Sequence, residues 1–217
     1  SSSWSQLGSD IDGEAAGDYS GTCVSLSGDG TIVAISATDN DGGGNNTGHV
    51  RVYQYASSSW SQLGSDIDGE AAIDKSGSSI SLSDDGTILA VGAYFNDGNG
   101  SSSGHVRVYQ YASSSWSQLG SDIDGEAAND LSGYSVSLSD DGTILAVGAY
   151  KNDGGGSEAG HVRVYKYASS SWTQLGSDID GEAAGDWSGI SVSLSGDGTK
   201  LAIGAAYNDG AGTNAGS

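Results

Sequence analysis

Residues 79–111 read SISLSDDGTILAVGAYFNDGNGSSSGHVRVYQY, and this stretch decides the fold. Its first five residues alternate polar and apolar side chains, a pattern typical of a half-buried strand. Asp84-Asp85-Gly86-Thr87 follows as a turn, in which Asp-Gly is expected to supply the positive φ angles of a tight hairpin. Residues 88–94 form a continuous apolar run, which indicates a strand covered on both faces. After a loop of turn residues at 96–104, the alternation at 105–111 predicts a third strand.

The same pattern recurs along the chain with a period of 56 residues, marked by a tryptophan in each unit. A short fourth strand, at 116–120, follows a serine-rich turn, and an acidic link at 121–126 leads into the next unit. No segment has apolar residues at a 3.6-residue period, so no helix is expected. Four short antiparallel strands per unit predict an all-β fold, a β-propeller of four-stranded antiparallel blades. The units are 1–56, 57–112, 113–168 and an incomplete 169–217.

Three motifs that recur along the chain resemble the FG-GAP repeat of integrin-α-type propellers. In the third unit they are Gly133-Tyr134-Ser135-Val136-Ser137-Leu138, Leu145-Ala146-Val147-Gly148-Ala149-Tyr150 and Gly160-His161-Val162-Arg163-Val164-Tyr165. The resemblance implies propeller blades and is compatible with adhesive, glycan-binding and structural functions. The chain departs from the family pattern in having Ser-Gly for Phe-Gly and a shortened loop, such as Gly28-Asp29-Gly30, at the family's calcium position. A two-residue hairpin does not supply six to eight oxygen ligands, so calcium is not expected there.

The composition excludes several classes of partner. The 217 residues contain 7 Lys+Arg and 28 Asp+Glu, a net charge of −21, so no cationic surface exists for nucleic acid. The sequence contains no stretch of about 20 apolar residues, so membrane insertion is not expected. The acidic, lysine-poor make-up, rich in Ser, Gly, Asn and Asp, favours an extracellular or cell-surface location. The single cysteine, Cys23, excludes an internal disulfide.

The acidic links are candidate metal sites. Asp residues at alternate positions followed by Gly resemble the start of a calcium loop, with hard oxygens that a turn folds around a cation. The EF-hand spacing is not met, and the competing interpretation is a solvated acidic turn between blades. The cofactor expectation is therefore either none or Ca²⁺. The candidate ligands are Asp10, Asp12, Glu14, Asp18, Asp66, Asp68, Glu70, Asp74, Asp122, Asp124, Glu126, Asp130, Asp178, Asp180, Glu182 and Asp186.

The long loops are candidate ligand-binding sites, because lectins pair Asn and Asp with an aromatic side chain and these loops have Tyr or Phe beside them in three of the four units. The same residue types are also those that any long hairpin loop uses. Two Asn-x-Ser/Thr glycosylation patterns, at 45–47 and 99–101, lie in these loops. The candidate ligand-binding residues are Asn40, Asp41, Asn96, Asp97, Asn152, Asp153, Asn208 and Asp209.

The remaining chemistry-bearing residues favour a structural role. One histidine per unit, at positions 49, 105 and 161, is too far from the others to share a metal with them, so a structural place at a strand edge is expected. The tryptophans are expected to cover the neighbouring strand, with an exposed aromatic band as the alternative. No Ser/His/Asp or Cys/His grouping is present, and the protein is not expected to be an enzyme.

The leading hypothesis is an extracellular structural or adhesive repeat protein that self-assembles, or extends, by completing blades. Residues 4–8 match a fourth strand and residues 201–205 a second strand, so unpaired edges are expected to seek partners. We expect residues 4–8, of the same or another copy, to pair with 201–205, unless the chain is part of a longer array. The alternative is a lectin-like propeller that binds glycans or a partner protein, with calcium as an optional cofactor.

Overall fold

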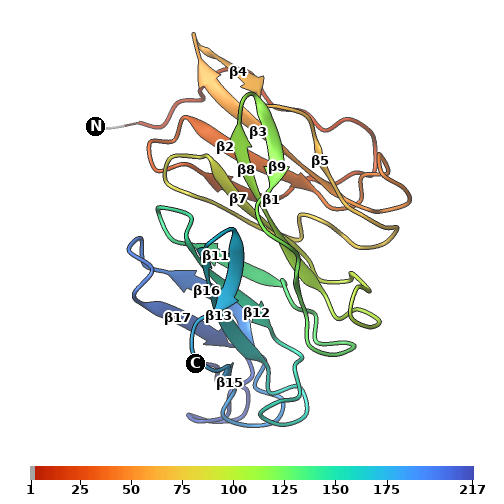
Figure 1. The fold of residues 1–217 in the computed structure, drawn as a ribbon, viewed down its shortest axis with the longest axis vertical. Helices are drawn as coiled ribbons and strands as arrows, with labels where there is room; N and C mark the ends of the chain where they lie inside the picture. The colour runs from red at the N-terminus through yellow and green to blue at the C-terminus, as the bar shows by residue number, and fades with distance from the viewer. Residues whose placement is uncertain (1–2) are drawn as a thin grey trace.

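The computed structural model describes residues 3–217, and none of them lies in a helix. The all-β prediction is confirmed. The strands form three five-stranded sheets and one two-stranded sheet, which lie in chain order along the long axis of the molecule (Figure 1). Nothing in the described range could cross a membrane as a helix, since no helix there is long and apolar enough.

Each sheet is one blade, and its strands follow one another in antiparallel order. Blade 1 contains β1 (Ser20–Leu26), β2 (Ile32–Ala37), β3 (His49–Ala56), β4 (Ser59–Gln62) and the short β5 (Ile67–Asp68), which pairs with β3. Blade 2 contains β6 (Ser79–Leu82), β7 (Ile88–Ala93), β8 (His105–Ala112), β9 (Ser115–Gln118) and β10 (Ile123–Asp124). Blade 3 contains β11 (Ser135–Leu138), β12 (Ile144–Ala149), β13 (His161–Ala168), β14 (Ser171–Gln174) and β15 (Ile179–Asp180). Blade 4 consists of β16 (Ser188–Leu194) and β17 (Leu201–Ala205).

The hairpin between the first two strands of a blade differs from the expected one. Of its turn residues only the glycine, Gly86 in blade 2, has a positive φ, so the turn is not of the type that needs two such residues. Gly86 donates its N–H to Ser83, closing a four-residue turn. Asp85 then accepts hydrogen bonds from the Ser83 hydroxyl and from both the N–H and the hydroxyl of Thr87. The aspartate therefore fixes the turn by accepting local donors.

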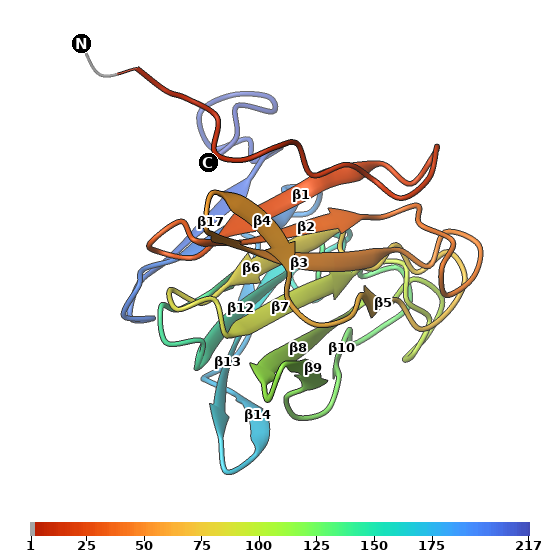
Figure 2. The same cartoon turned by 90° about the horizontal axis from the view of Figure 1, so that it is seen from above.

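Two apolar layers between successive blades form the core. In the first layer Val50 and Val52 of blade 1 pack with Leu89 and Val91 of blade 2, all 1% exposed or less. The second layer repeats this arrangement between blades 2 and 3. Strand β7 is buried at every position, which confirms that the apolar run is covered on both faces over 88–93, while Tyr94 is half-buried. The sheets are turned relative to one another about the stack, as successive blades of a propeller are (Figure 2).

The first strands of the blades, β1, β6, β11 and β16, lie side by side and are joined by hydrogen bonds from blade to blade. Gly28 N–H donates to the Asp84 carbonyl, Asp84 N–H to that of Asp140, and Asp140 N–H to that of Gly196, each at 2.8 Å. Serine hydroxyls of one blade add bonds to the next, as Ser79 does to the Gly133 carbonyl at 2.7 Å. These bonds fix the spacing of the blades independently of the apolar layers.

Residues 4–8 do not form the expected strand, since no strand is present before β1 in the described range. The Leu7 carbonyl instead accepts a hydrogen bond from the Trp60 indole at 2.9 Å, so this segment lies beside the outer hairpin of blade 1. At the other end of the chain, Ser217 exchanges two backbone hydrogen bonds with Ala205. The expected pairing of residues 4–8 with β17 is thus not found within one chain.

Candidate functional site

The first candidate site is the face of blade 1 that points away from blade 2. Val24 and Leu26 lie on this face and are 62% and 58% exposed. Their equivalents in blade 2, Ile80 and Leu82, are 7% exposed because blade 1 covers them. The register of β1 with β2 places Ile35 opposite Val24, which extends the apolar surface across two strands. Blade 1 therefore presents to solvent a surface that other blades bury, which we call the open face (Val24, Leu26, Val33 and Ile35).

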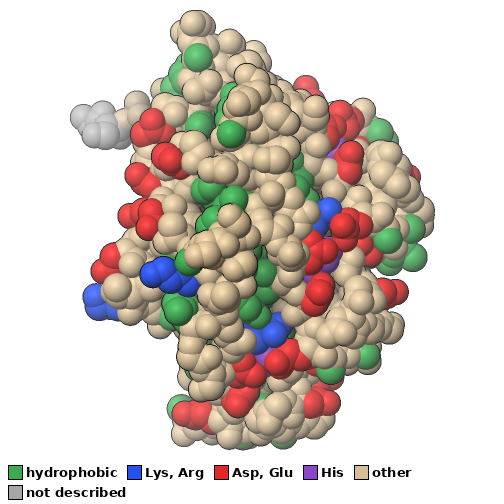
Figure 3. Space-filling view, in the orientation of Figure 1, with side chains coloured by type: hydrophobic (Ala, Val, Ile, Leu, Met, Phe, Trp, Pro, Cys, Tyr) green, Lys and Arg blue, Asp and Glu red, His purple; other side chains and the backbone are tan. Residues whose placement is uncertain are grey.

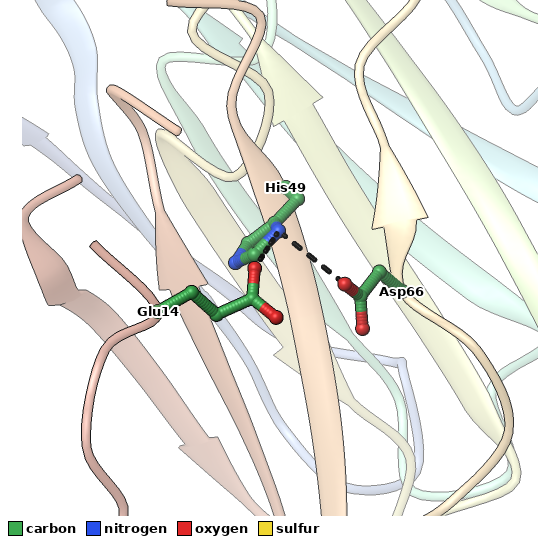
Figure 4. Close-up of side chains that lie close together, drawn as sticks. All are labelled: Glu14, His49 and Asp66. Atoms are coloured by element: carbon green, nitrogen blue, oxygen red, sulfur yellow. Dashed lines mark ion pairs between the residues drawn. The ribbon is translucent and has the colours of Figure 1, made fainter. Parts of the chain in front are cut away.

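The second candidate site is a cluster of one histidine and two carboxylates that is repeated in three blades. In blade 1, Nδ1 of His49 lies 3.8 Å from a carboxylate oxygen of Glu14 and 3.8 Å from one of Asp66 (Figure 4). The histidine is the first residue of β3 and is buried, whereas the two carboxylates come from the links before and after the blade. We call these the Glu-His-Asp clusters. They are Glu14/His49/Asp66, Glu70/His105/Asp122 and Glu126/His161/Asp178.

The electrostatics of the cluster are set by burial and by a neighbouring arginine. Burial, and then the charge of Arg107, lower the pKa of His105 to about 4 against the opposing effect of Asp122, so the ring is neutral at pH 7. Arg107 Nη1 lies 3.2 Å from Glu70, and its Nη2 donates to the Asp68 carbonyl at 2.8 Å. The arginine therefore orients the link that carries the glutamate. On the right-hand side of Figure 3 acidic groups lie close to histidine and arginine, and further acidic groups lie along the left-hand edge.

The structure divides the predicted metal ligands of the two middle links, at 66–74 and 122–130, among three places. The glutamate and the first aspartate, such as Glu70 and Asp66, belong to successive Glu-His-Asp clusters. The second aspartate is exposed, and its backbone carbonyl binds the arginine. The last aspartate, such as Asp74, is 3% exposed and accepts hydrogen bonds from Ala71 N–H and from the Asn96 amide. The four acidic residues of one link therefore do not converge on one cation.

The predicted ligand-binding residues of the long loops are occupied with fixing the loops themselves. Asn96 is 6% exposed, donates to Asp74 at 2.8 Å and accepts the Gly98 N–H at 2.8 Å. Asp97 accepts the Ser102 N–H at 2.7 Å. Corresponding bonds are present in the other loops, for Asn40, Asp41, Asn152, Asp153, Asn208 and Asp209.

A row of aromatic side chains runs across blades 2 to 4 beside these loops. Successive ring centroids are 4.3 to 5.4 Å apart, and the rings are tilted or edge-on to one another. At the blade 2 end, Tyr94 and Tyr134 line a hollow of about 380 Å³ together with Asp39 and Lys75, which form an ion pair at 2.6 Å. We call this set the aromatic row. Its members are Phe95, Tyr94, Tyr134, Tyr150, Trp187 and Tyr207.

The tryptophans at the 56-residue period lie elsewhere, on the outer hairpins. Trp116 packs half-buried against the first apolar layer, and its ring centroid is 5.2 Å from that of Tyr111. Its indole N–H donates to the Leu63 carbonyl at 2.9 Å, which ties the hairpin of blade 2 to the preceding link. Trp172 does the same one unit later. These two tryptophans cover their neighbours as expected, while Trp4 is fully exposed.

Blades of this order, packing and period define a repeat protein of the β-propeller class. Comparison with protein families finds the FG-GAP repeat three times in tandem, at residues 66–109, 122–165 and 178–217. These matches cover more than half of the chain, which therefore belongs to the FG-GAP repeat family. The resemblance seen in the sequence is confirmed. FG-GAP repeats are generally non-enzymatic.

Comparison with known proteins shows the fold but adds no function. No curated protein matches the chain significantly. A candidate 6-phosphogluconolactonase from Bacteroides fragilis is 12% identical with a TM-score of 0.53, over 83% of this chain and 40% of that one. Hydrazine synthase from Kuenenia stuttgartiensis is 14% identical with a TM-score of 0.52, over 90% of this chain and 45% of that one. This chain thus spans less than half the length of either structure, and the likeness concerns the fold alone.

Proposed function

We propose that the protein is a non-enzymatic, extracellular structural or adhesive repeat protein, which associates with further copies of itself through the open face of blade 1. The observation that carries this proposal is the contrast between Leu26, 58% exposed, and Leu82, 7% exposed at the same position of the next blade. An apolar surface of this kind on a protein in water favours association, because covering a Val or Leu side chain contributes roughly 1.5–3 kcal/mol when it is complete.

A second copy is the partner that fits, because the interfaces inside the chain show what the open face binds. Ile80 and Leu82, the equivalents of Val24 and Leu26, pack against the opposite face of a blade of the same repeat. In another copy the blade that presents this opposite face uncovered is blade 4, where Ala202, the equivalent of the buried Ala34, is exposed. The net charge of −21 opposes this contact at low salt, and added salt should favour it by screening.

The test is the mass of the particle in solution, measured by sedimentation over a range of protein and salt concentrations. We expect the mass of the wild type to rise with both, and that of Leu26→Asp to stay at the monomer value. Leu175→Asp is the matched control, since Leu175 is also exposed, at 44%, but lies on blade 3 outside the open face. A wild type that stays monomeric throughout, or a Leu26→Asp variant that associates equally, would refute the proposal.

A second candidate function, binding of glycans at the aromatic row, is favoured by a separate observation. Aromatic rings beside polar groups suit a sugar, whose apolar face stacks on a ring while its hydroxyls bond to charged and hydroxyl side chains. The hollow at Tyr94 and Tyr134 offers this combination, with Asp39, Lys75 and hydroxyl groups in its wall. Adding calcium or a chelator to a glycan-array experiment tests whether this function depends on calcium.

The differences between the second and third units also gather near the aromatic row. Most positions at which these units differ lie in the loops and links beside the row, including Lys75/Leu131, Ser78/Tyr134 and Phe95/Lys151. The strands between them are almost unchanged. Variation of loops on one face of a constant scaffold is typical of a binding face. Glycan-array binding that is lost in Tyr134→Ala and kept in Tyr111→Ala, which lies on an outer hairpin, would support this function, and equal binding by both variants would contradict it.

A further inference from the structure

The Glu-His-Asp cluster of blade 3 contains a buried polar atom that has no hydrogen-bond partner. The side chain of His161 is only 1% exposed, and its Nδ1 is fully buried without a hydrogen-bond partner. It faces a Glu126 oxygen at 3.7 Å and an Asp178 oxygen at 4.0 Å, distances too long for hydrogen bonds. Leaving a buried polar group unpaired costs about 1–3 kcal/mol, so such a group requires an explanation, and a bound ion is one of them. The nitrogen and the two oxygens surround a common point.

We propose that each Glu-His-Asp cluster binds a divalent transition-metal ion of the zinc type, through the histidine Nδ1 and one oxygen from each carboxylate. Zinc binds histidine nitrogen at about 2.0–2.1 Å and carboxylate oxygen at about 2.0–2.2 Å, which places tetrahedral ligand atoms roughly 3.4 Å apart. The nitrogen–oxygen separations of 3.8 Å in blade 1 and 3.7–4.0 Å in blade 3 need to shrink by about 0.3–0.6 Å to reach this value, and all three ligand atoms of each cluster already lie within 4.8 Å of one another.

The two kinds of ligand differ in a way that suits metal capture. The histidine is held rigidly in β3, β8 or β13, with its side chain 1–2% exposed. The carboxylates are 30–46% exposed and lie on links, so they can turn toward an ion. Arg51, Arg107 and Arg163 hold the second oxygen of each glutamate, at 3.8, 3.2 and 3.7 Å, and so orient the ligand from outside the cluster.

The ligand set favours a transition metal over calcium. Calcium takes six to eight oxygen ligands, whereas each cluster offers two carboxylates and a nitrogen. Imidazole nitrogen suits zinc, copper, nickel and iron, and three protein ligands leave a fourth position of a tetrahedron for water or an external ligand. The proposed site shares the glutamate and the first aspartate with the calcium ligands predicted from the sequence. The histidine is an additional ligand, and it changes the preferred metal.

The chain should bind three ions, because blade 4 has no complete cluster. Glu182 is present there, but Ser217 occupies the position that is His49, His105 or His161 in the other units. Calorimetric titration of the metal-free protein with zinc chloride should therefore give about three sites. His105→Asn should reduce the number to two, and the triple variant at 49, 105 and 161 should remove all of them. Asp97→Asn is the control, since Asp97 caps a loop outside the clusters and its replacement removes one negative charge.

Two further measurements keep the outcome interpretable. Cobalt chloride in place of zinc should give the visible absorption of a four-coordinate site, with an intensity that falls by one third in His105→Asn. A tenfold excess of calcium should leave the zinc stoichiometry unchanged. Far-UV spectra and melting of the metal-free variants establish that they are folded. Zinc binding that is unchanged in the triple histidine variant, absent from the wild type, or displaced by calcium would overturn the proposal.

Discussion

Leu26 and Leu82 occupy the same position in two successive blades, but a neighbouring blade covers only Leu82. Both side chains lie near the end of the first strand of their blade, on the face that points away from the following blade. Leu82 is 7% exposed because blade 1 packs on it, and Leu26 is 58% exposed. Leu→Ala at the two positions therefore measures how much a neighbouring blade contributes.

The expected losses of stability differ by about a factor of three. Leu82→Ala removes a covered side chain and leaves a cavity between two sheets, for which about 3 kcal/mol is typical. Less than half of Leu26 is covered, and water fills the space that alanine leaves, so about 1 kcal/mol or less is expected. For a chain of this length 1 kcal/mol lowers the melting temperature by roughly 2–4 °C. Leu82→Ala should thus lower it by about 6–12 °C and Leu26→Ala by at most about 4 °C.

The assay is calorimetric melting of both variants in dilute and in concentrated solution. In dilute solution, where the copies do not associate, the melting temperatures of the two variants should differ by the whole amount expected for the monomer. In concentrated solution the loss for Leu26→Ala should grow, because self-association covers the open face and its melting becomes concentration-dependent. Equal losses for the two variants in dilute solution would refute the view that the open face is uncovered in the monomer. A loss for Leu26→Ala that does not change with concentration would contradict association through this face.

Three other predictions concern the blades and their loops. Gly148→Ala should destabilise by about 1–3 kcal/mol in urea titration, because a Cβ there would overlap the Gly189 carbonyl of the next blade, whereas Gly204→Ala meets only a serine of its own blade and should be milder. Asn96→Ala should cost about 1–3 kcal/mol by the same assay, since it removes the 2.8 Å bond to a buried carboxylate, and an unchanged urea midpoint would show that the bond is dispensable. The pKa of Asp141 is lowered by hydrogen bonds from the Ser139 hydroxyl and then from the Thr143 N–H. The contribution of this carboxylate to the free energy of unfolding is therefore present above its ordinary pKa near 3.8 and is lost as the pH falls through the lowered value. The fall in urea midpoint between pH 6 and pH 3 should therefore be smaller in Asp141→Asn than in the wild type, and an equal fall would contradict the assignment.

The strands could be predicted from the sequence because they depend on local patterns. The alternation at 79–83 and the apolar run at 88–94 became β6 and β7 almost to the residue. The turn was harder, since Asp85 accepts three local hydrogen bonds and leaves only Gly86 with a positive φ. Residues 4–8 repeat the sequence of β9, but in the described range they pair with no strand, and the Leu7 carbonyl accepts the Trp60 indole N–H instead. Identical sequence does not give identical structure where the neighbour differs.

The aromatic row could not be read from the period of 56 residues. Tyr94 and Tyr150 occupy equivalent positions, but Tyr134, Trp187 and Tyr207 come from three other positions of the repeat. They meet because the segment after the second strand of one blade lies beside the start of the next blade. The useful signal was the appearance of aromatic residues at positions that vary between units, which a search for invariant residues passes over.

The Glu-His-Asp clusters could not be predicted by asking whether the three histidines share one metal, because the neighbours of each histidine are two carboxylates. His49 lies 35 residues after Glu14 and 17 residues before Asp66, and these spacings recur for His105 and His161. Only the blade geometry shows that two links, one before and one after the blade, reach the start of its third strand.

Each of the two middle links, 65–70 and 121–126, contributes to two clusters, and this arrangement couples the blades. The link after blade 1 gives Asp66 to the cluster of His49 and Glu70 to the cluster of His105. An ion bound in either cluster would restrain this link, and through it the separation of the two blades. Binding to the folded state alone adds RT ln(1 + [L]/Kd), about 2.7 kcal/mol for each site at a hundredfold excess over Kd. Zinc at that excess should consequently raise the melting temperature of the wild type, and Gly92→Ala, which displaces the Gly133 carbonyl between blades 2 and 3, should weaken zinc binding although it alters no ligand. Equal zinc affinity in Gly92→Ala and wild type would show that the clusters form without correct packing of the blades.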